Sequence, residues 1–179
     1  MIDRLLQHGI GGGGESNTKG IQRGEYSVLS TDLTINITIS PVDITKSIPK
    51  IFVCATGAST RANVTLFKCV LTSSTNLQIT RYSNGATFTA TIDWEVIEYN
   101  NVKSLQTGLL TLNTASTNIA ISSVNMLKTD LFLSFTITST YGLSEIMQIA
   151  MQLTSTTNLK FTGYGSMNYS IQWYAIEFN

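Results

Sequence analysis

The chain has 179 residues, enough for one large domain or two small ones. Its 11 basic and 11 acidic side chains give a formal net charge of zero, and only 12% of residues are charged. This balance argues against the basic surface that nucleic-acid binding needs. No stretch approaches the roughly 18 apolar residues of a membrane span, and the start lacks a signal-peptide pattern, so we expect synthesis in the cytoplasm without export.

Residues 1–20 differ in composition from everything that follows. Ile2, Leu5 and Leu6 have the spacing of one amphipathic helical turn, which is too short to be stable alone. The glycine-rich run over 9–14 loses much conformational entropy when it is ordered, which predicts a flexible tether. We expect the apolar tip to be an anchor that becomes ordered on a partner, and the alternative is an unstructured tail.

The spacing of the glycines in this arm matches a nucleotide-binding motif. Gly9, Gly11 and Gly14 fit G-x-G-x-x-G. That motif binds a dinucleotide only between a strand and the start of a helix, where the phosphate meets the helix N-terminus. No strand pattern precedes these glycines and no helical pattern follows them, so we reject the motif and expect no cofactor.

A first β module is predicted over residues 21–100. Short segments rich in β-branched residues alternate between polar and apolar positions, with turn residues between them. Pro41 and Pro49 mark breaks because proline cannot donate to a central ladder, and Asn84-Gly85 marks a turn. The expected strands are 21–24, 33–39, 50–55, 63–71, 77–81 and 87–99.

A second module over residues 101–179 repeats the first. Five landmarks recur in the same order, and their spacing drifts from 84 residues, between Gln22 and Gln106, to 79 residues, between Trp94 and Trp173. The most similar pair is Leu71-Thr72-Ser73-Ser74-Thr75-Asn76-Leu77 and Leu153-Thr154-Ser155-Thr156-Thr157-Asn158-Leu159. We therefore predict an all-β fold of two tandem antiparallel β-sandwich modules of about six strands each, after a flexible Gly-rich N-terminal arm.

The strands that close the two modules are apolar on both faces. One face of each carries a tryptophan, Trp94 or Trp173, which we place in the core of its sandwich. A strand with two apolar faces is covered on both, so the second face should meet the sister module or another chain. We predict a homo-oligomer, with an interface formed by Ile97, Tyr99, Ile176 and Phe178. The alternative is a β-bulge after Val96, which would return Ile97 to the core.

The residues indicate no catalytic or metal centre. His8 is the only histidine and lies in the arm, so the modules contain no Ser-His-Asp or Cys-His arrangement and no histidine-rich metal site. Asp93, Glu95 and Glu98 cluster on the first closing strand, but alternation separates Glu98 from the other two. Only Glu98 is retained in the second copy, as Glu177. We expect no enzyme activity and no catalytic, cofactor-binding or metal-binding residues.

The two cysteines are not shared by the modules. Cys54 and Cys69 correspond to Ser134 and Met151 in the second copy. The fold therefore does not depend on them, and cytoplasmic synthesis favours free thiols over a disulfide.

Taken together, the landmarks resemble small β-sandwich modules, similar in outline to H-type lectins, that occur in virion proteins of tailed bacteriophages. The resemblance covers residues 21–179 and rests on Ile21-Gln22-Arg23-Gly24, Ser40-Pro41-Val42, Ile51-Phe52-Val53, Leu71-Thr72-Ser73-Ser74-Thr75 and Trp94-Glu95-Val96-Ile97-Glu98-Tyr99. It implies a non-enzymatic virion structural protein, such as a tail-fibre, adaptor or head-decoration subunit. It also implies a trimer, contacts to other virion proteins through the N-terminal arm, and location in the virion after synthesis in the host cytoplasm.

The resemblance also leaves a carbohydrate-binding, lectin-like module for host recognition as the alternative. No sugar-binding motif of the lectins matches at fixed positions in this chain. The expected site would lie in the loops 56–61, 83–86 and 139–144. Three aromatic side chains in or beside loops could stack on a host surface glycan: Tyr82, Tyr141 and Tyr164.

Overall fold

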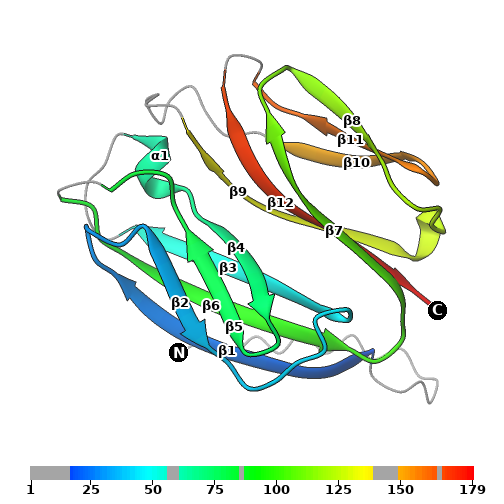
Figure 1. Cartoon of the computed structure of the whole chain (residues 1–179), viewed down its shortest axis with the longest axis horizontal. Coiled ribbons are helices and arrows are strands. Elements are labelled where there is room, and N and C mark those ends of the chain that lie inside the picture. Colours follow the sequence, from blue (N-terminus) through cyan, green and yellow to red (C-terminus); the bar gives the residue numbers. More distant parts are fainter. Residues whose placement is uncertain (1–16, 56–60, 85–86, 139–148, 165–166) are drawn as a thin grey trace, which may run out of the picture.

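The computed structural model describes residues 17–55, 61–84, 87–138, 149–164 and 167–179. These residues form an all-β fold of four three-stranded antiparallel sheets, which confirms the predicted fold class (Figure 1). Residues 1–16 of the expected arm over 1–20 lie outside the described residues. So do residues 56–60 and 85–86 of two expected loops and the whole loop 139–144 with Tyr141. Within the described part of the chain, no helix is long and apolar enough to cross a membrane.

The first six strands, which we call module 1, build two of the sheets. One sheet has the order β1-β6-β3 and the other β2-β5-β4, with a short helix α1 (Ala62–Thr65) before β4. Every neighbouring pair is antiparallel. The strands are β1 (Thr18–Val28), β2 (Thr34–Thr38), β3 (Ser47–Ala55), β4 (Lys68–Ser73), β5 (Asn76–Thr80) and β6 (Ala90–Tyr99).

The last six strands, module 2, repeat this topology strand for strand. The sheets are β7-β12-β9 and β10-β11-β8, so each strand occupies the place of the one six positions earlier. A 3-10 helix, η1 (Met126–Lys128), precedes β9. The strands are β7 (Val102–Leu112), β8 (Ser116–Ala120), β9 (Thr129–Ile137), β10 (Ala150–Ser155), β11 (Asn158–Thr162) and β12 (Tyr169–Phe178).

The repeated landmarks make the same contacts in both modules. The Gln22 amide donates to the Ser40 carbonyl at 2.9 Å and accepts from the Ser40 N–H at 2.7 Å. Gln106 and Ser122 repeat the pair at 3.0 and 2.7 Å. These bonds tie the first strand of each module to the segment after the second, which explains why the glutamine recurs.

The glycine two residues further on recurs because a tryptophan lies against it. Gly24 pairs with Trp94 across β1 and β6, and a Cβ at Gly24 would lie 2.5 Å from Cζ2 of the indole. Gly108 and Trp173 repeat the contact at 2.9 Å. The tryptophans pack against the core of their own module, as predicted.

Several element boundaries differ from the sequence-based expectation. β1 extends to Val28, and β6 begins at Ala90 and not at residue 87. β3 begins at Ser47, so the break expected at Pro49 is wrong and this proline lies within the strand. β1 begins at Thr18, so residues 18–20 belong to a strand and not to the arm. The strand expected over 63–71 begins only at Lys68, because α1 occupies its first residues. Tertiary contacts override β propensity there: Arg81, itself buried, donates to the Val64 carbonyl, and Ala62 is buried in the core of module 2.

The first closing strand keeps its register from Ala90 to Glu98 and shifts only at Tyr99, so the expected alternative of a bulge directly after Val96 is wrong. Residues from Gly20 to Val28 pair without a shift with Glu98 to Ala90. Val96 lies in the core of module 1, whereas Ile97 lies on the opposite face. Each closing strand therefore has two covered faces, as its pattern indicates.

The second face is covered by the sister module, which corrects the predicted interface between chains. Ile97 is 7% exposed and Ile176 is fully buried within a single chain. Tyr99 and Phe178 contact each other edge to face, with ring centroids 5.3 Å apart. Ile97 and Ile176 therefore supply no free apolar surface, and Tyr99 and Phe178 are half-buried against each other. The homo-oligomer stays a prediction without the support of these residues.

Candidate functional site

Of the three carboxylates singled out in the sequence, Glu98 joins separate segments of the fold. Glu95 pairs with Arg23 at 2.5 Å, whereas Asp93 is exposed. Glu98 accepts from the Lys19 ammonium at 2.8 Å and from the Asp43 N–H at 3.2 Å. No group of three His, Cys, Asp or Glu side chains is placed to bind a metal ion among the residues that the structure describes.

Glu177 repeats the role of Glu98 in module 2. Its carboxylate accepts from the Lys103 ammonium at 2.8 Å and from the Asn125 N–H at 2.9 Å. The Lys103 contact, followed by the Asn125 backbone bond, holds the pKa of Glu177 below its usual value. This carboxylate fixes the segment that enters β9, and so it serves the scaffold in both copies.

The two modules meet edge against face. The backbone N–H of Cys69, on edge strand β4, donates to the Ser134 hydroxyl of β9 at 3.0 Å, and that hydroxyl donates to the Cys69 carbonyl at 3.3 Å. The neighbouring Lys68 ammonium donates to the Ser170 hydroxyl of β12 at 2.9 Å. The Ser134 hydroxyl thus binds the backbone N–H and carbonyl of Cys69, which a neighbouring strand would otherwise bind. These bonds fix the position of β4 against β9.

Both cysteines are free thiols, as expected, but their surroundings differ. Cys54 is exposed, whereas Cys69 is 1% exposed at the module junction. Burial raises the pKa of the Cys69 thiol to about 11, an effect that the Ser134 hydroxyl only partly offsets. Because the thiolate is the reactive form, Cys69 is a structural residue at neutral pH.

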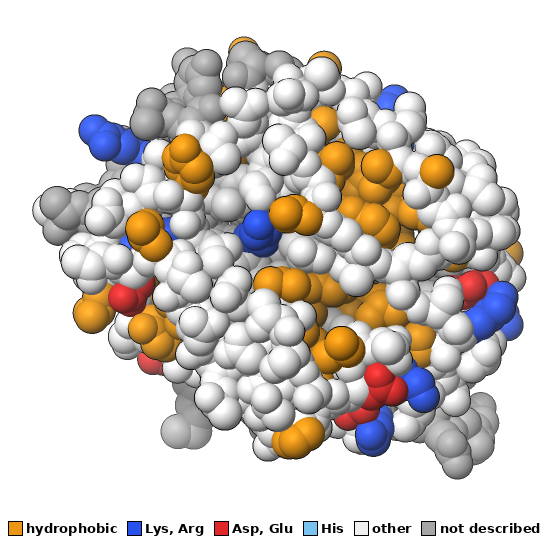
Figure 2. Space-filling view, viewed as in Figure 1, with side chains coloured by type: hydrophobic (Ala, Val, Ile, Leu, Met, Phe, Trp, Pro, Cys, Tyr) orange, Lys and Arg blue, Asp and Glu red, His pale blue; other side chains and the backbone are white. Residues whose placement is uncertain are grey.

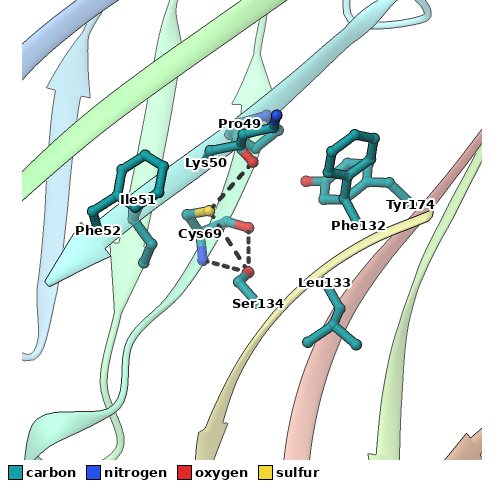
Figure 3. Close-up of a pocket in the computed structure, with 9 residues that line it drawn as sticks. All are labelled: Pro49, Lys50, Ile51, Phe52, Cys69, Phe132, Leu133, Ser134 and Tyr174. Carbon is teal, nitrogen blue, oxygen red and sulfur yellow. Dashed lines mark hydrogen bonds between the residues drawn. The ribbon is translucent and has the colours of Figure 1, made fainter. Parts of the chain in front are cut away.

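An apolar groove, the inter-module groove, runs between β3 and β9 beside this junction. Figure 2 shows hydrophobic side chains gathered in the middle of one face of the molecule. Two adjoining hollows of about 310 and 390 Å³ form the groove and share Ile51, Leu133 and Ser134. Figure 3 shows the first hollow, with Pro49 to Phe52 on one side and Phe132 to Ser134 on the other.

The β3 side of the groove is an unpaired strand edge. β3 pairs only with β6, and the Tyr99 N–H donates to the Lys46 carbonyl at 3.0 Å. Every second residue from Lys46 therefore directs its backbone toward β6, whereas Ile51 and Val53 direct theirs away from the sheet. Pro49 belongs to the outward set, which explains why a strand tolerates proline there.

The β9 side is built in the same way. β9 pairs only with β12, and the Thr138 N–H donates to the Asn168 carbonyl at 2.9 Å. By the same alternation, Leu133 and Phe135 direct their backbone groups away from β12. The described part of the chain offers no backbone partner to the outward groups of β3 or β9 in the groove.

Tyr174 lies in the wall of the groove and carries a hydroxyl without a partner. The side chain comes from β12 and is 5% exposed, and its hydroxyl forms no hydrogen bond within the described residues. Burial raises the pKa of this hydroxyl, and the backbone of Leu71 on β4, which lies beside it outside ideal hydrogen-bond geometry, lowers that pKa only in part. Figure 3 shows the phenol among the residues that line the hollow. The hydroxyl oxygen itself is enclosed, so it belongs to the packed junction of the modules and offers no free group to the groove.

The tyrosines predicted for sugar binding lie apart from this groove. Tyr82 follows β5 and Tyr164 follows β11, at equivalent places in the two modules. They are 53% and 58% exposed. The structure therefore presents two equivalent exposed rings and does not bring them into the inter-module groove.

Sequence reasoning missed the groove, although one landmark pointed to it. Phe52 and Phe132 are the central residues of the repeated Ile51-Phe52-Val53 and Leu131-Phe132-Leu133 segments. Both line the groove, where the Lys50 ammonium lies 4.5 Å from the Phe132 ring centroid. The alternation along each strand places Phe52 and Phe132 on the face away from the core. The strand pattern alone does not show that the edges of β3 and β9 meet beside them.

Comparison with known proteins adds no identification. No model of a protein family matches this chain, and neither a curated protein nor a solved structure is similar to it. The fold and the geometry of the groove therefore carry the functional argument.

Proposed function

We propose that the chain is a non-enzymatic structural subunit of a bacteriophage virion, in a tail fibre, an adaptor or a head decoration. The assignment to a virion rests on the sequence resemblance. The observation that supports a structural role is that a glutamine and a glutamate kept in both modules build the scaffold. Gln22 and Gln106 tie strands, and Glu98 and Glu177 fix the segments that enter β3 and β9.

The packing of the two modules suits a rigid subunit that holds its partners at a fixed distance. Two sandwiches share one buried junction, so the described modules behave as a single body. Such a body would serve as a spacer between partners in a particle, with the N-terminal arm as the contact to other virion proteins. A homo-oligomer, with a trimer favoured by the resemblance, belongs to the same proposal, and light scattering of the purified chain measures it.

The experiment that tests this function is a mass-spectrometric inventory of purified particles. The chain should be present in multiple copies in intact virions and absent from the soluble remainder of a lysate after assembly. Absence from the particle would refute the proposal.

Carbohydrate binding is the second candidate, and one observation favours it. Tyr82 and Tyr164 place an exposed ring at the same position of each module, and an aromatic ring combines an apolar face with a polar hydroxyl. A glycan array should then give binding that Tyr82→Ala and Tyr164→Ala reduce in an additive manner. An array without binding at high protein concentration would exclude this candidate.

A further inference from the structure

We propose that module 2 binds a neutral sugar residue of a glycan in a cleft between β7 and β8, with the indole N–H of Trp173 as a hydrogen-bond donor. This site is independent of the virion role. It is also separate from the exposed Tyr164, because that residue follows the end of β11 that pairs with Ser116, whereas the cleft lies at the Ala120 end of β8.

The cleft, which we call the β7–β8 cleft, opens at one side of module 2 between its two sheets. β7 pairs only with β12 and β8 only with β11, so both are edge strands and they belong to different sheets (Figure 1). The cleft has a volume of about 650 Å³. It is lined by residues 105–107 of β7, by residues 120–122 at the end of β8 and by Trp173, and none of these described residues is charged.

Trp173 is more than nine-tenths buried, yet its indole N–H is left without a partner. The residue is 8% exposed. Within the described residues its Nε1–H donates to no acceptor, and protein atoms do not enclose that nitrogen. The N–H is therefore open to the cleft that Trp173 lines. Because buried polar groups normally have hydrogen-bond partners, this donor is a group that a ligand would satisfy.

Gly108 keeps the indole N–H open. It pairs with Trp173 across β7 and β12, and a Cβ at this position would lie 3.0 Å from Nε1 and 2.9 Å from Cζ2. The edge of the indole that carries the N–H thus lies over the bare backbone of β7, next to residues 105–107 of the cleft. A side chain at residue 108 would crowd this donor, so the glycine serves the cleft as well as the packing of the core.

Gln106 and Ser122 add two further groups at fixed positions. The Gln106 amide donates to the Ser122 carbonyl at 3.0 Å and accepts from the Ser122 N–H at 2.7 Å. These bonds hold the amide in place and leave its second N–H for a ligand, because a primary amide has two donors. The Ser122 side chain is exposed, and its hydroxyl has no partner in the described part of the chain. The cleft thus presents two N–H donors and one hydroxyl.

This set of groups selects a neutral ligand that is rich in oxygen. N–H donors repel a cation, and the described lining holds no positive charge that would offset the desolvation of an anion. A sugar residue presents several hydroxyl and ether oxygens on one small ring, so a single residue can meet all three groups. An extended peptide offers one carbonyl per residue at a spacing of about 3.3 Å, and successive carbonyls point in opposite directions, so it matches this compact set less well.

Module 1 provides an internal comparison. Arg23 precedes Gly24 just as Thr107 precedes Gly108, and the Arg23 guanidinium pairs with Glu95. The place of an uncharged lining residue in module 2 is thus taken by an ion pair in module 1. We therefore expect the indole N–H of Trp94 to respond to a sugar far less than that of Trp173.

An NMR titration tests the proposal with the methyl glycosides of glucose, galactose, mannose and N-acetylglucosamine as probes. The indole N–H resonances of Trp94 and Trp173 in the isotopically labelled full chain are assigned with the variant Trp94→Phe. At least one glycoside should shift the Trp173 resonance along a saturable curve. The Trp94 resonance should shift far less at the same concentrations.

Two substitutions show whether the cleft is the site of binding. Ser122→Ala removes the free hydroxyl but keeps the backbone groups that bind Gln106, so it should weaken binding about threefold to tenfold. Trp173→benzothienylalanine keeps the shape of the ring and replaces its N–H by sulfur, so it should weaken binding by a similar factor, read from the Gln106 side-chain amide resonances. Ser116→Ala changes an exposed serine at the other end of β8. It is the matched control and should leave the titration unchanged.

Three results would overturn the proposal. The first is a Trp173 resonance that no glycoside shifts at tens of millimolar, or that a hexaproline peptide shifts while the glycosides do not. The second is a glycoside affinity in both Ser122→Ala and Trp173→benzothienylalanine equal to that of the unchanged chain. The third is glycoside binding that Tyr164→Ala abolishes and Ser122→Ala leaves intact, since the tyrosine candidate would then stand without the cleft.

Discussion

Gly24→Ala is predicted to destabilise module 1 by forcing a methyl group into the indole of Trp94. The added Cβ would lie 2.5 Å from Cζ2 and 2.8 Å from Cε2 of that ring. Overpacking a filled site costs about 1–3 kcal/mol. Replacement of glycine returns about 0.5–1 kcal/mol through the unfolded chain. The net loss should therefore be at most about 2.5 kcal/mol. We expect its upper part, about 1–2.5 kcal/mol, because the 2.5 Å contact is closer than real Cβ atoms show; this corresponds to about 2–10 °C in melting temperature for a body of this size.

Thermal and urea unfolding measure this effect, and the chain provides matched controls. At Gly108 the methyl group would lie 2.9 Å from Trp173, so Gly108→Ala should fall at the lower end of the range. Gly20 has no atom within 4 Å of a built Cβ, so Gly20→Ala should be neutral or stabilise by up to about 1 kcal/mol.

The double variant Gly24→Ala with Trp94→Phe separates steric conflict from other causes. Phenylalanine removes the indole atoms that meet the methyl group, so the two substitutions should be less than additive. Equal stability of Gly24→Ala and Gly20→Ala, or full additivity with Trp94→Phe, would refute the account of this contact.

Three further predictions concern the junction and the ion pairs. Ile176→Glu places a charge in a fully buried site between the modules, so it should cost about 3 kcal/mol or more in urea unfolding, with no change of oligomeric state in light scattering. The pKa of Glu177 is lowered in the folded chain, so its carboxylate stabilises the fold fully above about pH 4.5, the usual pKa of a glutamate. This stabilisation is lost as pH falls through the lowered pKa of the folded chain. Glu177→Gln should remove this pH-dependent part of the free energy of unfolding. Cys54 should react with iodoacetamide at pH 8 far faster than Cys69, whose pKa is about 11, as peptide mass spectrometry would show.

Each of these has a contrary outcome. Dissociation of an oligomer by Ile176→Glu, without loss of stability, would restore an interface between chains at that face. An unchanged pH profile in Glu177→Gln would show that the Lys103 and Asn125 contacts do not stabilise the folded chain. Equal labelling of the two cysteines would show that the module junction opens readily.

Much of the fold follows from the sequence because the duplication is visible in it. Alternation between polar and apolar residues fixes which face of each strand enters a core. The paired landmarks Gln22 with Gln106 and Gly24 with Gly108 survive because each makes a contact that the fold needs.

The junction could not be predicted in the same way. The sequence shows that the face with Ile97 must be covered, but it does not show that the sister module covers it. The helix α1 could not be predicted from the sequence for a related reason. Its residues favour strands, and only contacts to Arg81 and to module 2 make them helical. The inter-module groove depends on the approach of β3 and β9, which lie far apart in the chain.

The edge-to-face junction is the central claim, and a disulfide trap tests it most directly. The Cys69 Sγ and the Ser134 Oγ are 3.6 Å apart, a separation that a disulfide can bridge with a small shift. In a Cys54→Ser background, Ser134→Cys should form an intramolecular disulfide with Cys69 under mild oxidation, seen as a loss of two hydrogens in the intact monomer mass. Free thiols under the same conditions, or a disulfide only between chains, would contradict the packing of the two modules.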